Sequence, residues 1–298
     1  MKVLVTGANG LLGQHLVMQL LEKGFTVIGT GKGDARLHPE GVGDRYTYRT
    51  LDVSDPSDVQ EVMDAVKPEV VVHAAAMTQV DECELAPEQC EKINVTGTSL
   101  VLADAELYSS HFIYISTDFV FDGEQGNYKE NDDLKPISYY GFTKMQAEAM
   151  TETCSIPWAI VRTCLVYGDT LEGTRSNIIS WVKNSLEQGK DIRVVSDQWR
   201  TPTFVEDLAK GIVLIIEQKA TGVYHISGKD LLTPYDIAIQ TADLLELDKS
   251  KITKVDASTF KQPGKRPPKT GFIIEKARKE LGFEPVSFTE GLKKMLGI

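Results

Sequence analysis

The sequence predicts an α/β protein with a Rossmann-type, doubly wound parallel sheet and a smaller C-terminal α/β substrate lobe. Two observations support this prediction. Short apolar runs alternate with helical patterns from the first residues onward, which is typical of a parallel sheet covered by helices on both faces. The first apolar run also leads directly into a glycine-rich turn and a helix, which is how a βαβ unit begins.

The N-terminal half contains the most regular alternation. We expect strands at residues 2–6, 25–30, 69–73, 111–116 and 158–162, and helices at residues 11–23, 55–66 and 87–106 and around residue 140. The second of these helices has a clear start, because Asp55 can cap it, Pro56 occupies its first position and Asp58 adds an acid to its first turn. The short apolar run at 69–73 is what a parallel strand buried on both faces shows.

After Gly168 the alternation becomes less regular, which predicts a second structural unit. We expect a core at residues 1–168, to which residues 204–226 return, and a smaller lobe formed mainly by residues 169–298. The elements expected in this half are helices at 176–187, 204–217, 233–245 and 274–281 and a strand at 222–226. The helix after Thr233 again combines a cap, a proline and an acid at its start.

The composition argues against several functional classes. A net charge of −11 disfavours binding to a nucleic-acid backbone, which depends on clustered Lys and Arg. The longest apolar run, residues 212–216, is too short to span a bilayer, and no export signal is visible. Four scattered cysteines predict reduced thiols, and the five histidines show no metal-ligand spacing. We expect a cytoplasmic protein with no nucleic-acid or membrane partner and no metal in its site, and we leave open a homodimer and a divalent metal at an interface.

The glycine-rich turn after the first strand is a candidate dinucleotide site. Glycines let the backbone approach a pyrophosphate, whose charge the N–H groups at the start of the next helix stabilise. A simple strand-to-helix turn is the alternative, but the flanking strand and helix are those of a dinucleotide-binding unit. The residues expected to bind the cofactor here are Gly7, Asn9, Gly10, Leu11, Leu12 and Gly13.

The end of the second strand favours NADP(H), while NAD(H) stays open. NAD-binding proteins usually place an acid here for the ribose hydroxyls. This chain has Lys32 and no acid before Asp34, and a cation suits a 2′-phosphate; alternatively, Lys32 is only an exposed loop charge. Asp52 is expected at the adenine edge or, alternatively, as a turn cap. The three alanines after the strand at 69–73 are expected to line the cofactor's path or, alternatively, only to pack closely. The further expected cofactor contacts are Lys32, Asp52, Val53, Ala74, Ala75 and Ala76.

Tyr140 and Lys144 form a candidate proton-transfer pair. Their i, i+4 spacing places both side chains on one face of a helix. The ammonium is expected to lower the pKa of the phenol towards neutral pH and to hold the nicotinamide ribose. Thr117, which follows a strand, is expected to hydrogen-bond the substrate oxygen. Such a Tyr–Lys spacing also occurs by chance, but its position after a dinucleotide turn favours a hydride-transfer site.

With these segments the chain resembles the extended short-chain dehydrogenase/reductases, and within them the dTDP-4-dehydrorhamnose reductases, over nearly its whole length. The segments that carry the resemblance are residues 74–81, 116–123, 140–144, 162–168 and 197–203. The resemblance implies that Thr117, Tyr140 and Lys144 are catalytic, with NAD(P) bound by the core and the substrate by the smaller lobe. It also implies substrate contacts for Val80, Asp81, Asp118, Phe119, Leu165 and Arg266.

Two of these substrate residues depart from the family pattern. Leu165 stands where the family commonly has Trp, and Phe119 stands where it commonly has Tyr. Arg266 is implied to contact the substrate diphosphate, because its planar guanidinium suits that group. Loss of the Trp removes a large contact surface near the sugar, which affects the identity of the substrate more than the chemistry.

The resemblance implies NAD(P)H-dependent reduction of the 4-keto group of a nucleotide-diphosphate sugar, with dTDP-4-dehydrorhamnose as substrate in dTDP-L-rhamnose synthesis. One alternative is a noncatalytic NADP-binding regulatory subunit resembling that of methionine adenosyltransferase, which can keep the same catalytic residues. Another is a sugar-nucleotide epimerase or dehydratase. A dehydratase would have acids directly after Thr117, and here Asp118 is followed by Phe119.

Overall fold

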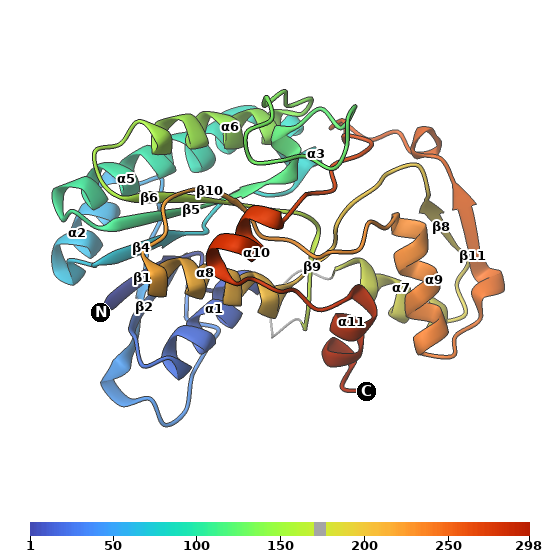
Figure 1. The fold of residues 1–298 in the computed structure, drawn as a ribbon, viewed down its shortest axis with the longest axis horizontal. Helices are drawn as coiled ribbons and strands as arrows, with labels where there is room; N and C mark the ends of the chain where they lie inside the picture. The colour runs from blue at the N-terminus through green and yellow to red at the C-terminus, as the bar shows by residue number, and fades with distance from the viewer. Residues whose placement is uncertain (170–176) are drawn as a thin grey trace.

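Seven parallel strands form the central sheet, in the order β10-β6-β5-β4-β1-β2-β3 (Figure 1). The structure is a computed structural model that describes residues 1–169 and 177–298. The strands of this sheet are β1 (Lys2–Thr6), β2 (Thr26–Gly31), β3 (Tyr46–Thr50), β4 (Val70–His73), β5 (His111–Thr117), β6 (Trp158–Thr163) and β10 (Gly222–His225). The strand order reverses between β1 and β4, and ligands of open parallel sheets bind beyond the carboxyl ends at such a point.

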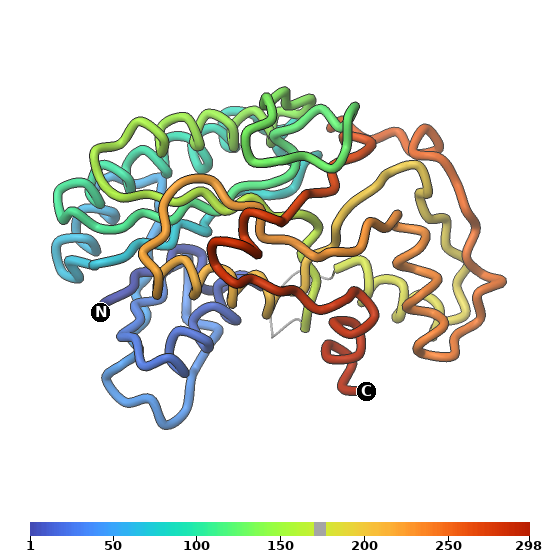
Figure 2. The backbone as a smooth tube through the Cα atoms, viewed as in Figure 1, coloured from blue at the N-terminus to red at the C-terminus, as the bar shows by residue number. Residues whose placement is uncertain are grey.

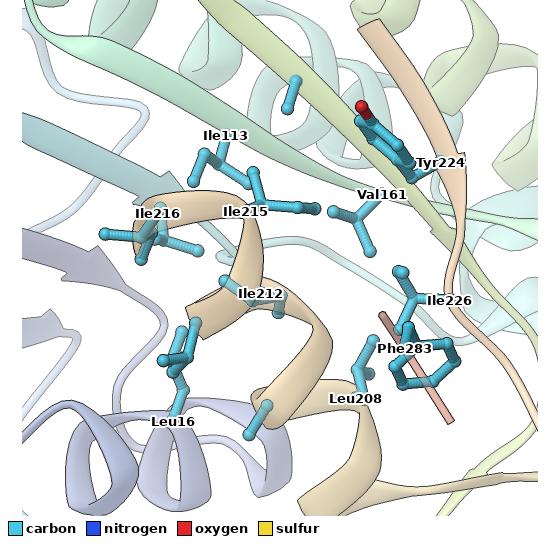
Figure 3. Close-up of a cluster of buried hydrophobic side chains, with 14 of the residues drawn as sticks. Leu16, Ile113, Val161, Leu208, Ile212, Ile215, Ile216, Tyr224, Ile226 and Phe283 are labelled. Carbon is cyan, nitrogen blue, oxygen red and sulfur yellow. The ribbon is translucent and has the colours of Figure 1, made fainter. Parts of the chain in front are cut away.

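Helices cover both faces of the sheet, as the predicted doubly wound fold requires (Figure 1). The helices on one face are α1 (Leu11–Glu22), α8 (Val205–Gln218) and α10 (Glu275–Leu281), and those on the other are α2 (Pro56–Val66), α5 (Gly97–Leu107) and α6 (Tyr139–Glu152). Figure 3 shows the first face, where Leu16 of α1 and Ile212 of α8 pack towards Ile113 of β5. Each such buried side chain stabilises the fold by about 1.5–3 kcal/mol. The predicted α/β class is therefore confirmed.

The long helix expected at residues 87–106 is interrupted. It consists of α4 (Pro87–Glu91), one π-helical turn labelled η2 (Lys92–Thr96), and α5. The buried Asn94 lies in this turn, and π turns inside helices often occur at functional sites. The expectation of one regular α-helix is wrong because the hydrophobic periodicity does not reveal an extra residue in a turn.

A smaller unit lies beside the large sheet (Figure 1). Its elements are α7 (Ile178–Glu187), β8 (Ile192–Val195), α9 (Pro234–Leu244) and β11 (Ile252–Val255). β8 pairs in parallel with β11, and α7 packs against α9 over a separate apolar cluster. The predicted cap of α9 is present, since Thr233 and Asp236 form a reciprocal capping box. The predicted start of α7 at Ser176 lies outside the described residues.

The C-terminal chain connects the two units. Figure 2 shows it leaving the smaller unit and returning to the large sheet, and on the way Gly264 and Arg266 contact Asp81 of the short helix at Val80–Leu85. The remaining elements are α3 (Val80–Leu85), β7 (Val166–Tyr167), β9 (Thr203–Phe204), α11 (Phe288–Leu296) and 3-10 helices at Gly43–Arg45, Asp118–Val120, Lys249–Lys251 and Ala257–Thr259. Among the described residues, no helix is both long enough and apolar enough to cross a bilayer.

Candidate active site

A cavity of about 720 Å³ lies at the carboxyl ends of the strands, where the strand order reverses. Most of the residues predicted to form the site line it. They are Gly7, Asn9, Gly10, Leu11, Leu12, Gly13, Lys32, Val53, Ala74, Ala75, Ala76, Val80, Thr117, Asp118, Phe119, Tyr140, Lys144 and Leu165. Of the predicted residues, Asp52, Asp81 and Arg266 are not part of this lining. Within residues 1–169 and 177–298, no group of three or more His, Cys, Asp or Glu side chains could hold a metal ion.

The glycine-rich turn has the geometry that a pyrophosphate requires. Gly7 has a φ of +70°, and a Cβ at this position would lie 2.9 Å from the Ala75 backbone N. A Cβ on Gly13 would lie 2.3 Å from the Gly7 carbonyl oxygen. Gly10 caps α1, and in this described segment no side chain bonds the first N–H groups and no acid occupies the first turn. The start of α1 therefore suits an anionic group.

Lys32 and Asp52 contact each other at the end of β2. Lys32 Nζ lies 2.7 Å from Asp52 Oδ2, and the Lys32 side chain is 59% exposed. Asp52 Oδ1 also accepts hydrogen bonds from Ser54 N at 3.0 Å and Ser54 Oγ at 2.8 Å. Asp52 therefore caps a turn, which was the alternative to an adenine contact, while its neighbour Val53 lines the cavity.

Tyr48 and Arg36 lie near Asn9, and the sequence did not predict either of them as part of the site. Asn9 Nδ2 donates to Tyr48 Oη at 2.7 Å and to the Asp34 carbonyl oxygen at 2.9 Å, and Asn9 Oδ1 accepts from Arg36 N at 3.0 Å. These bonds order the loop after β2 and hold Tyr48 and the backbone of Arg36 beside Asn9, which lines the cavity. The alternating pattern at residues 46–50 could have predicted β3 and so drawn attention to Tyr48.

Thr117 and Tyr140 meet because β5 ends where α6 begins. Ser138 caps α6 by accepting a hydrogen bond from Gly141 N at 3.2 Å. A Cβ on Gly141 would lie 2.1 Å from the Phe119 carbonyl oxygen, so this glycine permits the close approach. The rings of Phe119 and Tyr140 lie edge to face with centroids 5.8 Å apart. The predicted catalytic hydroxyls therefore share one wall of the cavity.

Lys144 lies one helical turn after Tyr140 and is buried. Its Nζ donates to the Ile115 carbonyl oxygen at 2.7 Å and lies 4.1 Å from the centroid of the Tyr114 ring. Burial lowers the pKa of Lys144 to about 7, partly opposed by the charge of Glu148. Lys144 can therefore change its charge near neutral pH.

Burial determines the protonation of Tyr140. It raises the pKa of the phenol well above its ordinary value, and a hydrogen bond with Thr117 only partly lowers it again. The expectation that Lys144 brings this pKa towards neutral is therefore wrong for this structure. Spacing along a helix predicts that two groups are neighbours, but it does not reveal how much water they lose.

A buried ion pair holds α6 on the side away from the cavity. Glu148, one turn after Lys144, accepts hydrogen bonds from Arg162 Nε at 3.0 Å and Arg162 Nη2 at 2.7 Å. It also accepts a hydrogen bond from Ser116 Oγ, next to Thr117. The pair ties α6 to both β5 and β6. In the sequence, the only indication of Glu148 is its i+4 spacing from Lys144, which places both side chains on one face of the helix.

His73 and Asn94 have structural roles. The two ring nitrogens of His73 lie 3.0 Å from Thr6 Oγ1 and 3.1 Å from Thr98 Oγ1. Burial lowers the pKa of His73 to about 3, so this ring is neutral at physiological pH. Asn94 accepts from Met77 N at 2.8 Å and donates to Met77 O at 3.0 Å, which orders the backbone after the alanines. Neither residue is placed as an acid or base.

Asp81 and Arg266 bind each other. Arg266 Nη1 lies 2.6 Å from Asp81 Oδ1, and Arg266 Nη2 lies 2.7 Å from Asp81 Oδ2. Gly264 N also donates to Asp81 Oδ1 at 3.0 Å. Because Asp81 belongs to α3, this bidentate contact joins the C-terminal chain to the helix that begins with Val80, a cavity-lining residue.

Comparison with known proteins identifies a family and several similar proteins. The profile of the family described as "RmlD substrate binding domain" matches residues 1–298. A dTDP-4-dehydrorhamnose reductase from Aggregatibacter actinomycetemcomitans is 29% identical, over 99% of this chain and 98% of that protein. Methionine adenosyltransferase 2 subunit beta from Xenopus tropicalis is 29% identical, over 85% of this chain and 75% of that protein.

Solved structures show the same arrangement. A crystal structure of a dTDP-4-dehydrorhamnose reductase from Clostridium acetobutylicum has a TM-score of 0.87 and 31% identity, and the match covers 100% of this chain and 99% of that chain. The dTDP-4-dehydrorhamnose reductase from Bacillus anthracis, solved in complex with NADP, has a TM-score of 0.84 and 28% identity, with 99% and 98% covered.

Proposed function

Since this chain belongs to the RmlD substrate binding domain family, we propose that it uses NADPH to reduce the 4-keto group of a nucleotide-diphosphate sugar, and that this sugar is dTDP-4-dehydrorhamnose. The observation that carries the proposal is the meeting of Thr117, Tyr140 and Lys144 on the wall of the cavity that also contains the glycine-rich turn. Relatives named as dTDP-4-dehydrorhamnose reductases support the choice of sugar.

The side chains have distinct roles in the proposed reaction. Bound NADPH supplies the hydride. Tyr140 donates the proton to the carbonyl oxygen, and its hydroxyl is protonated at neutral pH because burial raises its pKa. Thr117 donates to the same oxygen, in place of the Asp118 Oδ1 to which its hydroxyl donates at 3.2 Å in this structure, and so directs the oxygen to Tyr140. Lys144 holds a positive charge beside them when protonated.

The proposed cofactor preference predicts a selective effect at Lys32. Lys32→Ala should weaken NADPH binding by about 0.5–2 kcal/mol, because one exposed charge-assisted contact to the 2′-phosphate is lost. NADH binding should change little, and the NADP found with a relative supports this preference. Dissociation constants for both cofactors, measured by fluorescence titration, check the prediction.

Lys23 offers a matched control, because it is similarly exposed and paired, with its Nζ 3.3 Å from Glu217 Oε1. Lys23→Ala should leave both dissociation constants unchanged. Equal affinity of the wild type for NADPH and NADH would contradict the proposed preference.

The substrate proposal is tested at Arg266. Purified protein should oxidise NADPH in the presence of dTDP-4-dehydrorhamnose, and Arg266→Ala should raise the Michaelis constant by the equivalent of about 1.5–3 kcal/mol, the range for a hydrogen bond to a charged group. Asp81 binds this guanidinium, so the diphosphate must either displace the Asp81 carboxylate or bind the guanidinium together with it. Lys265→Ala is the neighbouring control. An unchanged Michaelis constant in Arg266→Ala would remove the diphosphate assignment.

A noncatalytic regulatory role is the second candidate, supported by the similarity to methionine adenosyltransferase 2 subunit beta. It predicts NADPH binding without turnover of any 4-keto nucleotide sugar. An epimerase or dehydratase would instead convert a sugar nucleotide without net consumption of NADPH. Assays of a panel of nucleotide-diphosphate sugars, which measure both product formation and NADPH consumption, distinguish the reductase, the regulatory subunit and the epimerase or dehydratase.

A further inference from the structure

A short segment of the C-terminal chain, residues 266–270, crosses from the smaller unit to the catalytic end of the sheet, and we call it the strap. Its backbone is bonded to the loop before β9. Trp199 N donates to the Pro268 carbonyl oxygen at 2.7 Å, and Thr270 N donates to the Trp199 carbonyl oxygen at 3.0 Å. These two bonds form an isolated parallel β-bridge between Trp199 and Lys269, which is not part of a sheet.

Arg200 is buried beneath the strap, with its side chain only 6% exposed. Its Nη2 donates to the Pro267 carbonyl oxygen at 2.8 Å, and its Nη1 lies 2.8 Å from the Trp199 carbonyl oxygen and 3.4 Å from that of Pro268. Its Nε lies 3.5 Å from Asp118 Oδ2. One guanidinium therefore binds the strap, its supporting loop and an acid at the catalytic end of β5.

Asp118 connects the same network to the catalytic threonine. Thr117 Oγ1 donates to Asp118 Oδ1 at 3.2 Å, and Cys164 Sγ donates to Asp118 Oδ2 at 3.3 Å. Thr270, at the end of the strap, also donates its hydroxyl to Asp118. All four side chains are buried, so this carboxylate is desolvated and the low local dielectric strengthens the hydroxyl bonds to it.

The other end of the strap carries Arg266, which is bound bidentately by Asp81 of α3. The strap is thus attached at both ends, to Asp118 beside the catalytic Thr117 and to Asp81 on α3. Because Arg200 binds the carbonyl oxygen of Pro267, the residue next to Arg266, a displacement of Arg200 would be transmitted to Arg266 through the strap backbone.

We propose that Arg200 is a positioning residue that holds the strap on the catalytic end of β5 and so places Arg266 for the substrate diphosphate. The role of Arg266 in this inference rests on the proposed function, whereas the holding of the strap does not. Arg200 has this role because its planar fork reaches three carbonyl oxygens and a carboxylate at once, which the single ammonium of a lysine cannot do.

Hydrogen exchange tests the holding of the strap without any substrate. In the full-length protein, Arg200→Lys and Arg200→Met should both raise exchange of the Trp199 and Thr270 amides by about tenfold or more, the change expected from loss of one charge-assisted bond. Arg193→Met is the matched control, because this arginine packs over Phe260 of the smaller unit, and it should leave both amides unchanged.

Ligand binding tests the consequence for the site. With dTDP as the probe, the Arg200 variants should bind about tenfold more weakly than the wild type, and NADPH should bind within about twofold of the wild type. A purely structural defect would weaken the binding of both dTDP and NADPH. If Arg200→Met does not fold, Thr270→Val serves instead, because it keeps the shape of the side chain and removes only the hydroxyl bound to Asp118.

The outcomes are distinguishable. Unchanged amide exchange in both Arg200→Lys and Thr270→Val would overturn the positioning role, and so would rescue of exchange and dTDP affinity by Arg200→Lys. Faster exchange with unchanged dTDP affinity would overturn the link to Arg266. If the wild type did not bind dTDP, the proposed substrate would fall, while the exchange data alone would still decide whether Arg200 holds the strap.

Discussion

Tyr140→Phe is expected to lower turnover by about two to four orders of magnitude, the usual contribution of a positioned acid or base. The buried hydroxyl is hydrogen-bonded to Thr117 and stays protonated because burial raises its pKa, so its removal leaves the carbonyl oxygen without a proton donor. The ring remains and keeps its edge-to-face contact with Phe119, so the fold and NADPH affinity should not change. Single-turnover kinetics with dTDP-4-dehydrorhamnose measure the rate of reduction, and a separate titration measures the NADPH affinity.

The preceding tyrosine provides the control. Tyr139 begins the same helix, but its hydroxyl donates to Glu91 Oε2 at 3.0 Å, away from the cavity lining. Tyr139→Phe should therefore turn over at the wild-type rate. Wild-type turnover in Tyr140→Phe would show that another group donates the proton.

Glu148→Ala is expected to lower the free energy of unfolding by about 3–5 kcal/mol, because it leaves a buried guanidinium without its carboxylate. The Glu148 and Arg162 side chains are 1% and 3% exposed, so water cannot replace the lost partner. Two other contacts of Arg162 carry no compensating negative charge: Nη1 donates to the Glu130 carbonyl oxygen at 3.0 Å, and the guanidinium lies 5.3 Å from the centroid of the Phe121 ring. Urea denaturation at neutral pH measures the change.

An exposed ion pair gives the matched comparison. Arg278 Nη2 lies 3.0 Å from Glu284 Oε1, but these side chains are 34% and 63% exposed, so Glu284→Ala should cost less than about 1 kcal/mol. In Glu148→Ala, replacing Arg162 with Met as well should recover part of the lost stability. If Glu148→Ala cost no more than Glu284→Ala, the buried pair would not be what holds α6 on the sheet.

The sequence was sufficient for features that depend on local chemistry. Alternating periodicities predicted the parallel sheet, and the cap, proline and acid after Asp55 and Thr233 predicted the starts of α2 and α9. The resemblance carried by the short motifs is confirmed at the level of the family. The residues around the glycine-rich turn and the pair Tyr140 and Lys144 do line one cavity, because parallel strands present their carboxyl ends at one edge.

Only the tertiary structure decided how the charged groups are paired. Asp52 binds Lys32, Asp81 binds Arg266 and Glu148 binds Arg162, although 14 to 185 residues separate the members of these pairs. Local sequence does not specify which distant segments meet.

Only the tertiary structure likewise decided the pKa values of Tyr140 and Lys144. The pKa of Tyr140 is raised and that of Lys144 is lowered, mainly by burial. The i, i+4 spacing along α6 predicted that the two side chains are neighbours, and this depends only on helix geometry. The cost of removing each charge from water depends on every element packed around it, so these pKa values follow from the completed fold.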